Sequence, residues 1–456
     1  MMMKDDIDFG NMEIPKLFRK LLVPTVLGMI FSATFVITDG IFVGKGIGSD
    51  ALAAVNIIAP LFLINVGVAL MFGVGASVVA SIHLSQGKIK AARINVTQAV
   101  LFSSLLLAIL WGTVLLFAPQ FVMWLGSSER LLPLVLEYTY WSVPYFVFSA
   151  LLTSGMFFIR LDGAPNYAMI CNTIPAIINL LLDYVFIFVF GWGMMGAAFA
   201  TSLGYTIGAV MIVIYLTQKK RTIHFIPIKW SKKSMLLTWR NIRYMFRLGF
   251  STFLCEASIA CMMFVGNYIF MAYLGEDGVA AFSVACYFFP IMFMAYNAIG
   301  QAAQPILSYN FGAGYAVRVK RTFYLALFTA VTCGGLFLIG TILFDEQIVA
   351  MFIKQSCAAY DIAVSGLPLF ALGFIFFAIN IVSIGYFQSV EQARPAMTVT
   401  VLRGFVFMMI CMFGLPLILN VRGIWLAMPL AETLTSFIIM IIYHKQQRLI
   451  YADIHN

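Results

Sequence analysis

The sequence predicts an all-α integral membrane protein with twelve transmembrane helices in two six-helix lobes. Of its 456 residues, 62% are hydrophobic and only 10% are charged, whereas a soluble globular protein carries roughly 25% charged residues. The apolar segments are about 20–28 residues long, enough for a helix to cross ~30 Å of hydrocarbon. They do not alternate in polarity as the strands of a membrane barrel would. Because only helices and closed barrels can span lipid, we expect helices.

The predicted spans are apolar runs bounded by charged or turn residues. They lie at 18–44, 52–82, 95–118, 134–159, 168–190, 194–217, 247–273, 279–309, 322–344, 362–388, 396–419 and 423–443. An even number of spans places both termini on one side of the membrane. Of the 28 Lys and Arg residues, 23 fall on that side, four on the other, and Arg403 within a span. This bias places both termini in the cytoplasm and explains the positive net charge without a nucleic-acid partner.

The two halves of the chain resemble each other. "GSDALAAV" begins at Gly48 and "GEDGVAAF" begins at Gly275, 227 positions later. With the same offset, "GMMGAAFA" ending at Ala200 matches "NVRGIWLA" ending at Ala427. Six spans per half return the chain to the same side, so the repeats are parallel and related by an axis along the membrane normal, as in many transporters.

The basic linker at 218–246 separates the predicted lobes, which we assign to residues 1–225 and 226–456. Residues 40–46, "GIFVGKG", differ from a P-loop because the spacing is one residue short and glycine follows the lysine. The sequence shows no motif for a nucleophile, a metal or a nucleotide, so we expect no enzyme activity and no cofactor. An ion gradient would then drive transport, and a saturable, gradient-coupled flux would distinguish a transporter from a channel.

Away from the ends of the predicted spans lie five charged residues, at depths where a charge costs about 2.5–3.5 kcal/mol and usually marks an ion or substrate path. They are the acids Asp39, Asp183, Glu256 and Glu432 and the base Arg403. At a rise of 1.5 Å per residue, Asp39 lies roughly 27 Å and Asp183 roughly 22 Å from the cytoplasmic edge, within about a turn of the same level. Glu256 lies nearer the middle, at roughly 13 Å. Arg403 and Glu432 could instead be structural partners of each other.

Amides accompany two of these spans. Asn172, Asn179 and Asp183 are spaced by seven and four residues, which puts them on one helical face. A second stripe comprises Asn297, Gln301 and Gln304. Both faces suit the wall of a hydrated pocket, and polar contacts between helices are the alternative interpretation.

The pattern resembles the multidrug and toxic compound extrusion (MATE) family over the chain from about Leu17 to Tyr443. The residues that carry the resemblance are "LLVPTVLGMIFSATFVITDGIFVGKGIGSDALAAVNIIAP", "NLLLDYVFIFVFGWGMMGAAFAT" and the six-plus-six repeat. The resemblance implies a V-shaped pair of lobes around a central cavity that opens alternately to each side. It also implies export of bulky organic cations in exchange for Na+ or H+.

The family's residues can be carried over one at a time. The first-span acid matches Asp39, the fifth-span acid matches Asp183 with Asn179 beside it, and the bend of the first helix matches Pro24. The seventh-span acid of one branch matches Glu256. That branch also has an acid in its tenth span, where this sequence has Asn380, so the chain resembles more closely the MepA/DinF-like branch.

These observations predict a secondary antiporter of the inner cell membrane that exports small organic cations in exchange for H+ or Na+. Asp39, Asp183 and Asn179 would bind the coupling cation, and repacking of the first helix at Pro24 would release the substrate. We expect a monomer whose other partners are membrane lipids. The alternative is a flippase for a lipid-linked oligosaccharide, which would need cationic side chains for a pyrophosphate head group, and only Arg403 lies within a span.

Overall fold

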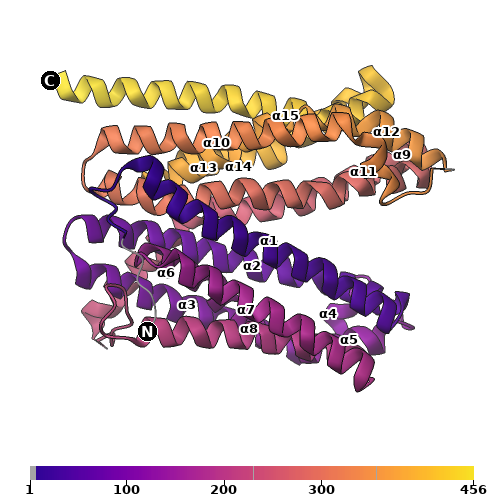
Figure 1. Ribbon diagram of the computed structural model, residues 1–456, viewed down its shortest axis with the longest axis horizontal. Helices are drawn as coiled ribbons and strands as arrows, with labels where there is room; N and C mark the ends of the chain where they lie inside the picture. The colour runs from indigo at the N-terminus through magenta and orange to yellow at the C-terminus, as the bar shows by residue number, and fades with distance from the viewer. Residues whose placement is uncertain (1–6, 230, 356, 456) are drawn as a thin grey trace. The chain divides into compact units, whose positions relative to one another are not determined.

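The computed structural model describes residues 7–229, 231–355 and 357–455, with the backbone alone described at 49, 52 and 446–455. All regular secondary structure in these residues is helical (Figure 1). The first half contains α1 (Ile14–Gly46), α2 (Ser49–Ser85), α3 (Ile89–Leu116), α4 (Ala118–Trp124), α5 (Leu132–Ser142), the 3-10 turn η1 (Val143–Tyr145), α6 (Phe146–Leu161), α7 (Pro165–Asp183), the π-helix η2 (Tyr184–Val189) and α8 (Gly193–Thr217). The second half contains α9 (Lys232–Gly312), α10 (Ala316–Leu343), α11 (Asp345–Ala350), α12 (Ala358–Ala371), α13 (Phe374–Ser389), α14 (Ala393–Val401), the π-helix η3 (Leu402–Phe407) and α15 (Met408–His455).

The helices account for the twelve predicted spans. Within the described residues, nine helices are long and apolar enough to cross a membrane, and the bent pair of α12 and α13 brings the number to ten. Two of the nine are double, because α9 is broken by non-helical backbone at Gly275 and the stretch Ala393–Lys445 is broken at Asn420. Each break corresponds to a predicted connection on the outer side, so the count rises to twelve.

The basic linker is shorter than predicted. The sequence suggested that span seven begins at residue 247, whereas α9 begins at Lys232, with the hydroxyl of Ser231 accepting a hydrogen bond from the Ser234 N–H at 3.2 Å. The charged side chains alternate with an apolar face, on which Ile242 and Met245 are buried. The helix therefore extends through the charged residues that bound the predicted span.

The tenth span is bent, which the sequence did not predict. The axes of α12 and α13 differ by 47° across a short break. Pro368 removes a backbone donor from the last turns of α12. Gly373 in the break lies against Met428 and Pro429 of α15, where a Cβ atom would collide. The bend therefore lets the broken span pack closely on α15.

The chain forms two compact units. The first comprises Met1–Phe253 and Ser308–Ala316, and the second comprises Leu254–Leu307 and Val317–Asn456. The end of α9 belongs to the first unit because its side chains contact the N-terminal segment. The Asn310 amide donates to the Phe9 carbonyl at 3.1 Å, and the rings of Phe9 and Tyr309 lie 5.7 Å apart.

The interlobe linker is fixed to the first unit by a buried acid. Asp162, after α6, accepts from the Ile223 N–H at 2.6 Å and from the Tyr215 hydroxyl at 2.8 Å. The Arg93 guanidinium donates to the Thr222 carbonyl at 2.9 Å. These bonds hold the start of the linker against α3, α6 and α8.

Two glycines make a close crossing of α2 with the first part of α9. Gly75 of α2 lies against the Met245 carbonyl, and Gly249 of α9 lies against the Met71 carbonyl. The two contacts mirror each other, since the helices run in opposite directions. Small residues commonly allow such close backbone approach between membrane helices.

Gly249→Ala is therefore expected to destabilise the protein, because the new Cβ atom would meet the Met71 carbonyl. Overpacking of this kind costs about 1–3 kcal/mol. Thermal unfolding in detergent measures the effect. The matched control is Gly112→Ala on α3, where a Cβ atom meets nothing within 4 Å. Equal melting temperatures for the two variants would contradict the role of this crossing.

Candidate functional site

Two carboxyl groups from different helices meet in the first unit. Asp39 lies on α1 and is half-buried, whereas Asp183, the last residue of α7, is fully buried. The two carboxyl groups lie close enough to interact directly. The structure thus brings together the two acids that the depth estimate placed at one level.

The packing of α1 on α7 and η2 sets this geometry. The two helices lie side by side (Figure 1). Gly46 at the end of α1 rests against Ile187 and Phe188 of η2, and the rings of Phe42 and Phe188 meet edge to face at 5.6 Å. The π-helix η2 begins directly after Asp183. Such wide turns are rare in proteins, and those that occur are often found at functional sites.

A close contact with α8 adds further oxygen atoms. Gly204 of α8 lies against Asn179 and the Pro175 carbonyl of α7, where a Cβ atom would be crowded. The contact brings the Asn179 amide to 3.3 Å from the hydroxyl of Thr201, to which it donates. Asn179 is 1% exposed, so this hydrogen bond lies in the protein interior.

Apart from the contact between the two carboxyl groups, four buried acceptor oxygens of this site have no hydrogen-bond partner within the described residues. They are Oδ1 of Asp39, both carboxylate oxygens of Asp183 and Oδ1 of Asn179. Burial of polar groups without partners is costly, and buried charges in proteins are normally paired. The arrangement can accept a proton on a carboxyl group, or it can hold a hard cation that prefers oxygen ligands.

Two tyrosines lie within electrostatic range of the acids. Tyr138 on α5 interacts electrostatically with Asp39, Asp183 and Tyr205, and Tyr205 on α8 interacts with Asp39. The ring of Tyr205 stacks on Phe62 of α2 at 6.0 Å. The site therefore draws on α1, α5, α7 and α8, which belong to the first, fourth, fifth and sixth spans of this half.

A second link between α1 and α7 lies close to Pro24, the predicted bend of α1. Pro24 lies buried within α1. One turn further along, the Gly28 carbonyl accepts a hydrogen bond of 2.7 Å from the Asn172 amide. Asn172, which we expected on a pocket wall, thus ties α7 to α1 close to the proline.

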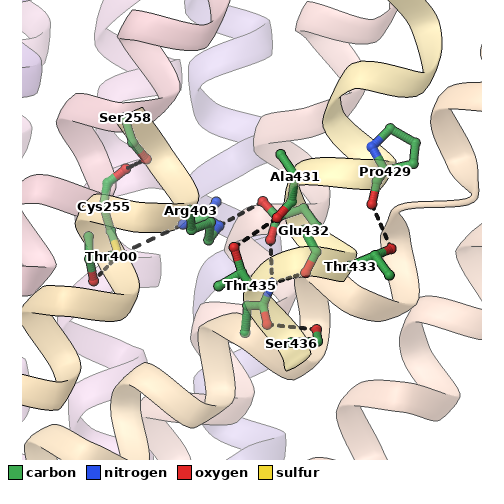
Figure 2. A network of polar contacts seen from close by, with 11 residues as sticks. Cys255, Ser258, Thr400, Arg403, Pro429, Ala431, Glu432, Thr433, Thr435 and Ser436 are labelled. Atoms are coloured by element: carbon green, nitrogen blue, oxygen red, sulfur yellow. Dashed lines mark hydrogen bonds and ion pairs between the residues drawn. The ribbon is translucent and has the colours of Figure 1, made fainter. Parts of the chain in front are cut away.

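In the second unit, Arg403 and Glu432 form a buried ion pair (Figure 2). Arg403 Nε lies 2.7 Å from Glu432 Oε1, with the side chains 3% and 0% exposed. Asn380 donates to Glu432 Oε2 at 2.6 Å and to its carbonyl at 2.8 Å, and accepts from the Ser436 hydroxyl at 2.8 Å. The guanidinium also lies over the Phe377 ring at 4.6 Å. Asn380, which we expect near a substrate cavity, is part of this network.

The remaining predicted residues lie on α9 in the second unit. Asn297 and Gln301 are half-buried, and Gln304 is buried at 4% exposure. Glu256 is half-buried and adjoins Cys255, whose sulfur lies 4.0 Å from the Arg403 guanidinium. These side chains belong to the second unit, whereas Asp39 and Asp183 belong to the first.

Sequence reasoning missed Thr201, Tyr138 and Tyr205. Thr201 and Tyr205 are four residues apart and flank Gly204, and this combination of polar and small residues on one face could have indicated a site. Tyr138 offered no such signal, because a tyrosine near the end of a span normally indicates an anchor at the membrane interface.

Comparisons with known proteins agree with this architecture. A family model described as MatE matches residues 24–185 and 253–420, more than two thirds of the chain. The multidrug export protein MepA of Staphylococcus haemolyticus is 24% identical over 466 residues, covering 98% of both chains. MepA of Staphylococcus aureus (strain NCTC 8325 / PS 47) is 24% identical over 461 residues, covering 97% of this chain and 96% of its own length.

Solved structures share the fold. The outward-facing conformation of a multidrug resistance MATE family transporter of the MOP superfamily matches with a TM-score of 0.88 at 20% identity, covering 96% of this chain and 97% of that chain. A MOP superfamily transporter from Pyrococcus furiosus, described as having a binding pocket of reverse polarity, matches with a TM-score of 0.86 at 20% identity and the same coverage.

The family match covers spans of both halves and includes both acids of the first unit. The predictions of an all-helical fold with twelve spans in two lobes and of a transporter rather than an enzyme are confirmed. The chain is a multi-pass membrane transporter that belongs to the MatE (multidrug and toxic compound extrusion) family.

Proposed function

We propose that the protein is a secondary multidrug antiporter that exports organic cations in exchange for H+ or Na+. The observation that carries this proposal is the set of four buried acceptor oxygens on Asp39, Asp183 and Asn179. Acceptors without donors favour a proton or a metal cation, and intramembrane acids of this kind usually mark ion paths. The names of the relatives, multidrug export proteins, support the same direction of transport.

The coupling step follows from the electrostatics of two adjacent carboxyl groups. Asp39 and Asp183 cannot both stay ionised in a partly dehydrated site without cost. Uptake of H+ or Na+ from the outer side removes this repulsion. Asp39 is half-buried and Asp183 fully buried, so Asp39 would meet the entering cation first.

Movement of α1 would then link the site to the substrate. Neutralised acids no longer repel each other, and α1 can pack differently where Pro24 interrupts its hydrogen bonds. The Asn172–Gly28 bond would transmit this change between α7 and α1. Repacking weakens the site for an organic cation, which leaves outward, and exit of the coupling cation to the cytoplasm resets the cycle. The side chains of Asn297, Gln301, Gln304 and Glu256 are candidates for substrate contacts.

The alternative function, flipping of a lipid-linked oligosaccharide, receives less support. A pyrophosphate head group requires accessible cationic side chains. Arg403, the base predicted within a span, is 3% exposed and paired with Glu432. Accumulation of the lipid-linked precursor in a deletion strain would favour this alternative over drug export.

Dye transport in everted vesicles, with the proton and sodium gradients imposed separately, tests the proposed function. We expect uptake of a cationic dye to follow one of the two gradients and to stop when that gradient is collapsed, since no nucleotide motif supplies another energy source. Uptake that continues with both gradients collapsed would contradict antiport.

In this account the protein is a monomer in the cell membrane with both termini in the cytoplasm. The charge bias supports this orientation, since 23 of the 28 Lys and Arg residues belong to the side of the termini. A C-terminal green fluorescent protein fusion should be fluorescent, and a C-terminal alkaline phosphatase fusion should be inactive. An active phosphatase fusion would reverse the orientation.

A further inference from the structure

The polar cluster around the ion pair of the second unit draws on the same set of spans as the cluster around the acids of the first. Cys255, Asn380, Arg403 and Glu432 lie on α9, α13, η3 and α15, which are parts of the first, fourth, fifth and sixth spans of that half. Asp39, Tyr138, Asp183 and Thr201 of the first unit lie on α1, α5, α7 and α8, its own first, fourth, fifth and sixth spans. Both polar clusters are thus built from corresponding helices.

The fifth spans share a second feature. A π-helical segment begins directly after Asp183 in the first unit, and another contains Arg403 in the second. π-Helical turns are rare, well under 1% of residues in globular proteins. The two segments lie in corresponding spans but at different positions, because the 227-residue offset of the repeat matches Arg403 to Ala176 rather than to Asp183.

The two clusters differ in how their acceptors are satisfied. In the first unit, both oxygens of Asp183 lack a hydrogen-bond partner within the described residues other than the neighbouring acid Asp39. In the second unit, Glu432 Oε1 pairs with Arg403 Nε, and Oε2 accepts from the Asn380 amide. The guanidinium occupies the position at a buried carboxylate that a free cation would otherwise take.

We propose that Arg403 is a built-in cation that occupies a latent cation site at Glu432 in the second unit. While Arg403 is in place, this unit binds no exchangeable cation. Removal of the guanidinium would leave Glu432 Oε1 without its partner and available to a proton or an alkali cation. The comparison with the first unit rests on the function proposed above.

The contacts of Arg403 explain why a free cation does not displace it. The side chain is tethered, 3% exposed and bonded to Glu432 at 2.7 Å. Its guanidinium also lies 4.6 Å from the centre of the Phe377 ring, a favourable cation–π arrangement. An entering ion would have to remove all of these contacts at once.

The test is the thermal stability of Arg403→Gln in purified protein that also carries Asp39→Asn and Asp183→Asn, which silence the first unit's acids. Melting temperatures are compared in Na+, Li+ and N-methylglucamine chloride at constant ionic strength, and across a pH series. We expect Arg403→Gln to gain several degrees on addition of an alkali cation or on acidification, because a ligand that binds only the folded state stabilises it.

Two further variants serve as controls in the same background. Arg403→Gln combined with Glu432→Gln removes both charges and should melt independently of the cation, whereas Arg403→Lys keeps a resident cation and should respond like the parent. The other titratable groups near Glu432 are Cys255 and Tyr296, with Glu256 beside Cys255, and they are unchanged in every variant. The control pair therefore isolates the carboxylate of Glu432.

Identical responses of Arg403→Gln and the double-charge control to every cation and pH would overturn the proposal. If Arg403→Gln alone fails to fold, rescue by Na+, Li+ or acid during solubilisation supports it, and failure under all these conditions while the control folds overturns it. Failure of the proposed antiport function gives a different result, since the first unit's acids are absent from all these proteins. That failure would appear only as dye transport independent of both gradients.

Discussion

We expect the Asp183→Asn variant to lower gradient-driven dye efflux at least about tenfold. A loss of about 1.4 kcal/mol in the free energy of binding the coupling cation already corresponds to a factor of ten. An asparagine fits the buried space but cannot exchange a proton and carries no charge for Na+. The side chain is 0% exposed, and apart from its contact with Asp39 its oxygens have no hydrogen-bond partner within the described residues, so Asp39 would remain as a single acid. Efflux from cells at matched expression measures the change.

A conservative change at an exposed acid provides the control for this variant. Asp361 lies in the first turn of α12 and is exposed, so Asp361→Asn makes the same chemical change away from the site. We expect the control to keep full efflux. If Asp183→Asn also keeps full efflux, the acids of the first unit do not couple transport.

The Glu432→Gln variant is expected to lose about 3–5 kcal/mol of stability, the usual cost of leaving a buried charge without its partner. The loss arises because Arg403 remains inside the second unit with its carboxylate partner removed. Unfolding of the detergent-solubilised protein measures it as a large fall in melting temperature and in the yield of monodisperse protein.

Second-site rescue separates charge from packing at this position. Adding Arg403→Gln to Glu432→Gln should recover most of the lost stability, because removing both members of a buried ion pair is often nearly neutral. A double variant as unstable as Glu432→Gln alone would mean that shape rather than charge holds this network together.

The sequence was a good guide to the fold because membrane spans leave a strong signal in composition. Long apolar runs and the placement of basic residues fixed the number of spans, and the 227-residue offset divided them into two sets of six. The start of α9 at Lys232 escaped prediction, since a helix can continue beyond the membrane with charged residues on one face. The 47° bend in the tenth span escaped because it depends on packing of Gly373 against α15.

The site was only partly predictable for a similar reason. Depth along a helix is encoded by residue number, so Asp39 and Asp183 could be placed at one level. Which helices pack together is a tertiary property, and it brought Thr201 to Asn179 and Tyr138 into electrostatic range of the acids. Asn380 shows the limit most clearly, since its span position suggested a cavity but its amide is bonded to Glu432.

The central claim is that one coupling cation and one substrate compete through Asp39 and Asp183. Equilibrium binding of a fluorescent organic cation to purified protein, titrated against pH and Na+, tests it most directly, because linkage requires each ligand to weaken the other equally. The account predicts that affinity falls as protons or Na+ rise in the wild-type protein and that this dependence disappears in Asp39→Asn and Asp183→Asn. The same dependence in the wild type and both variants would contradict it.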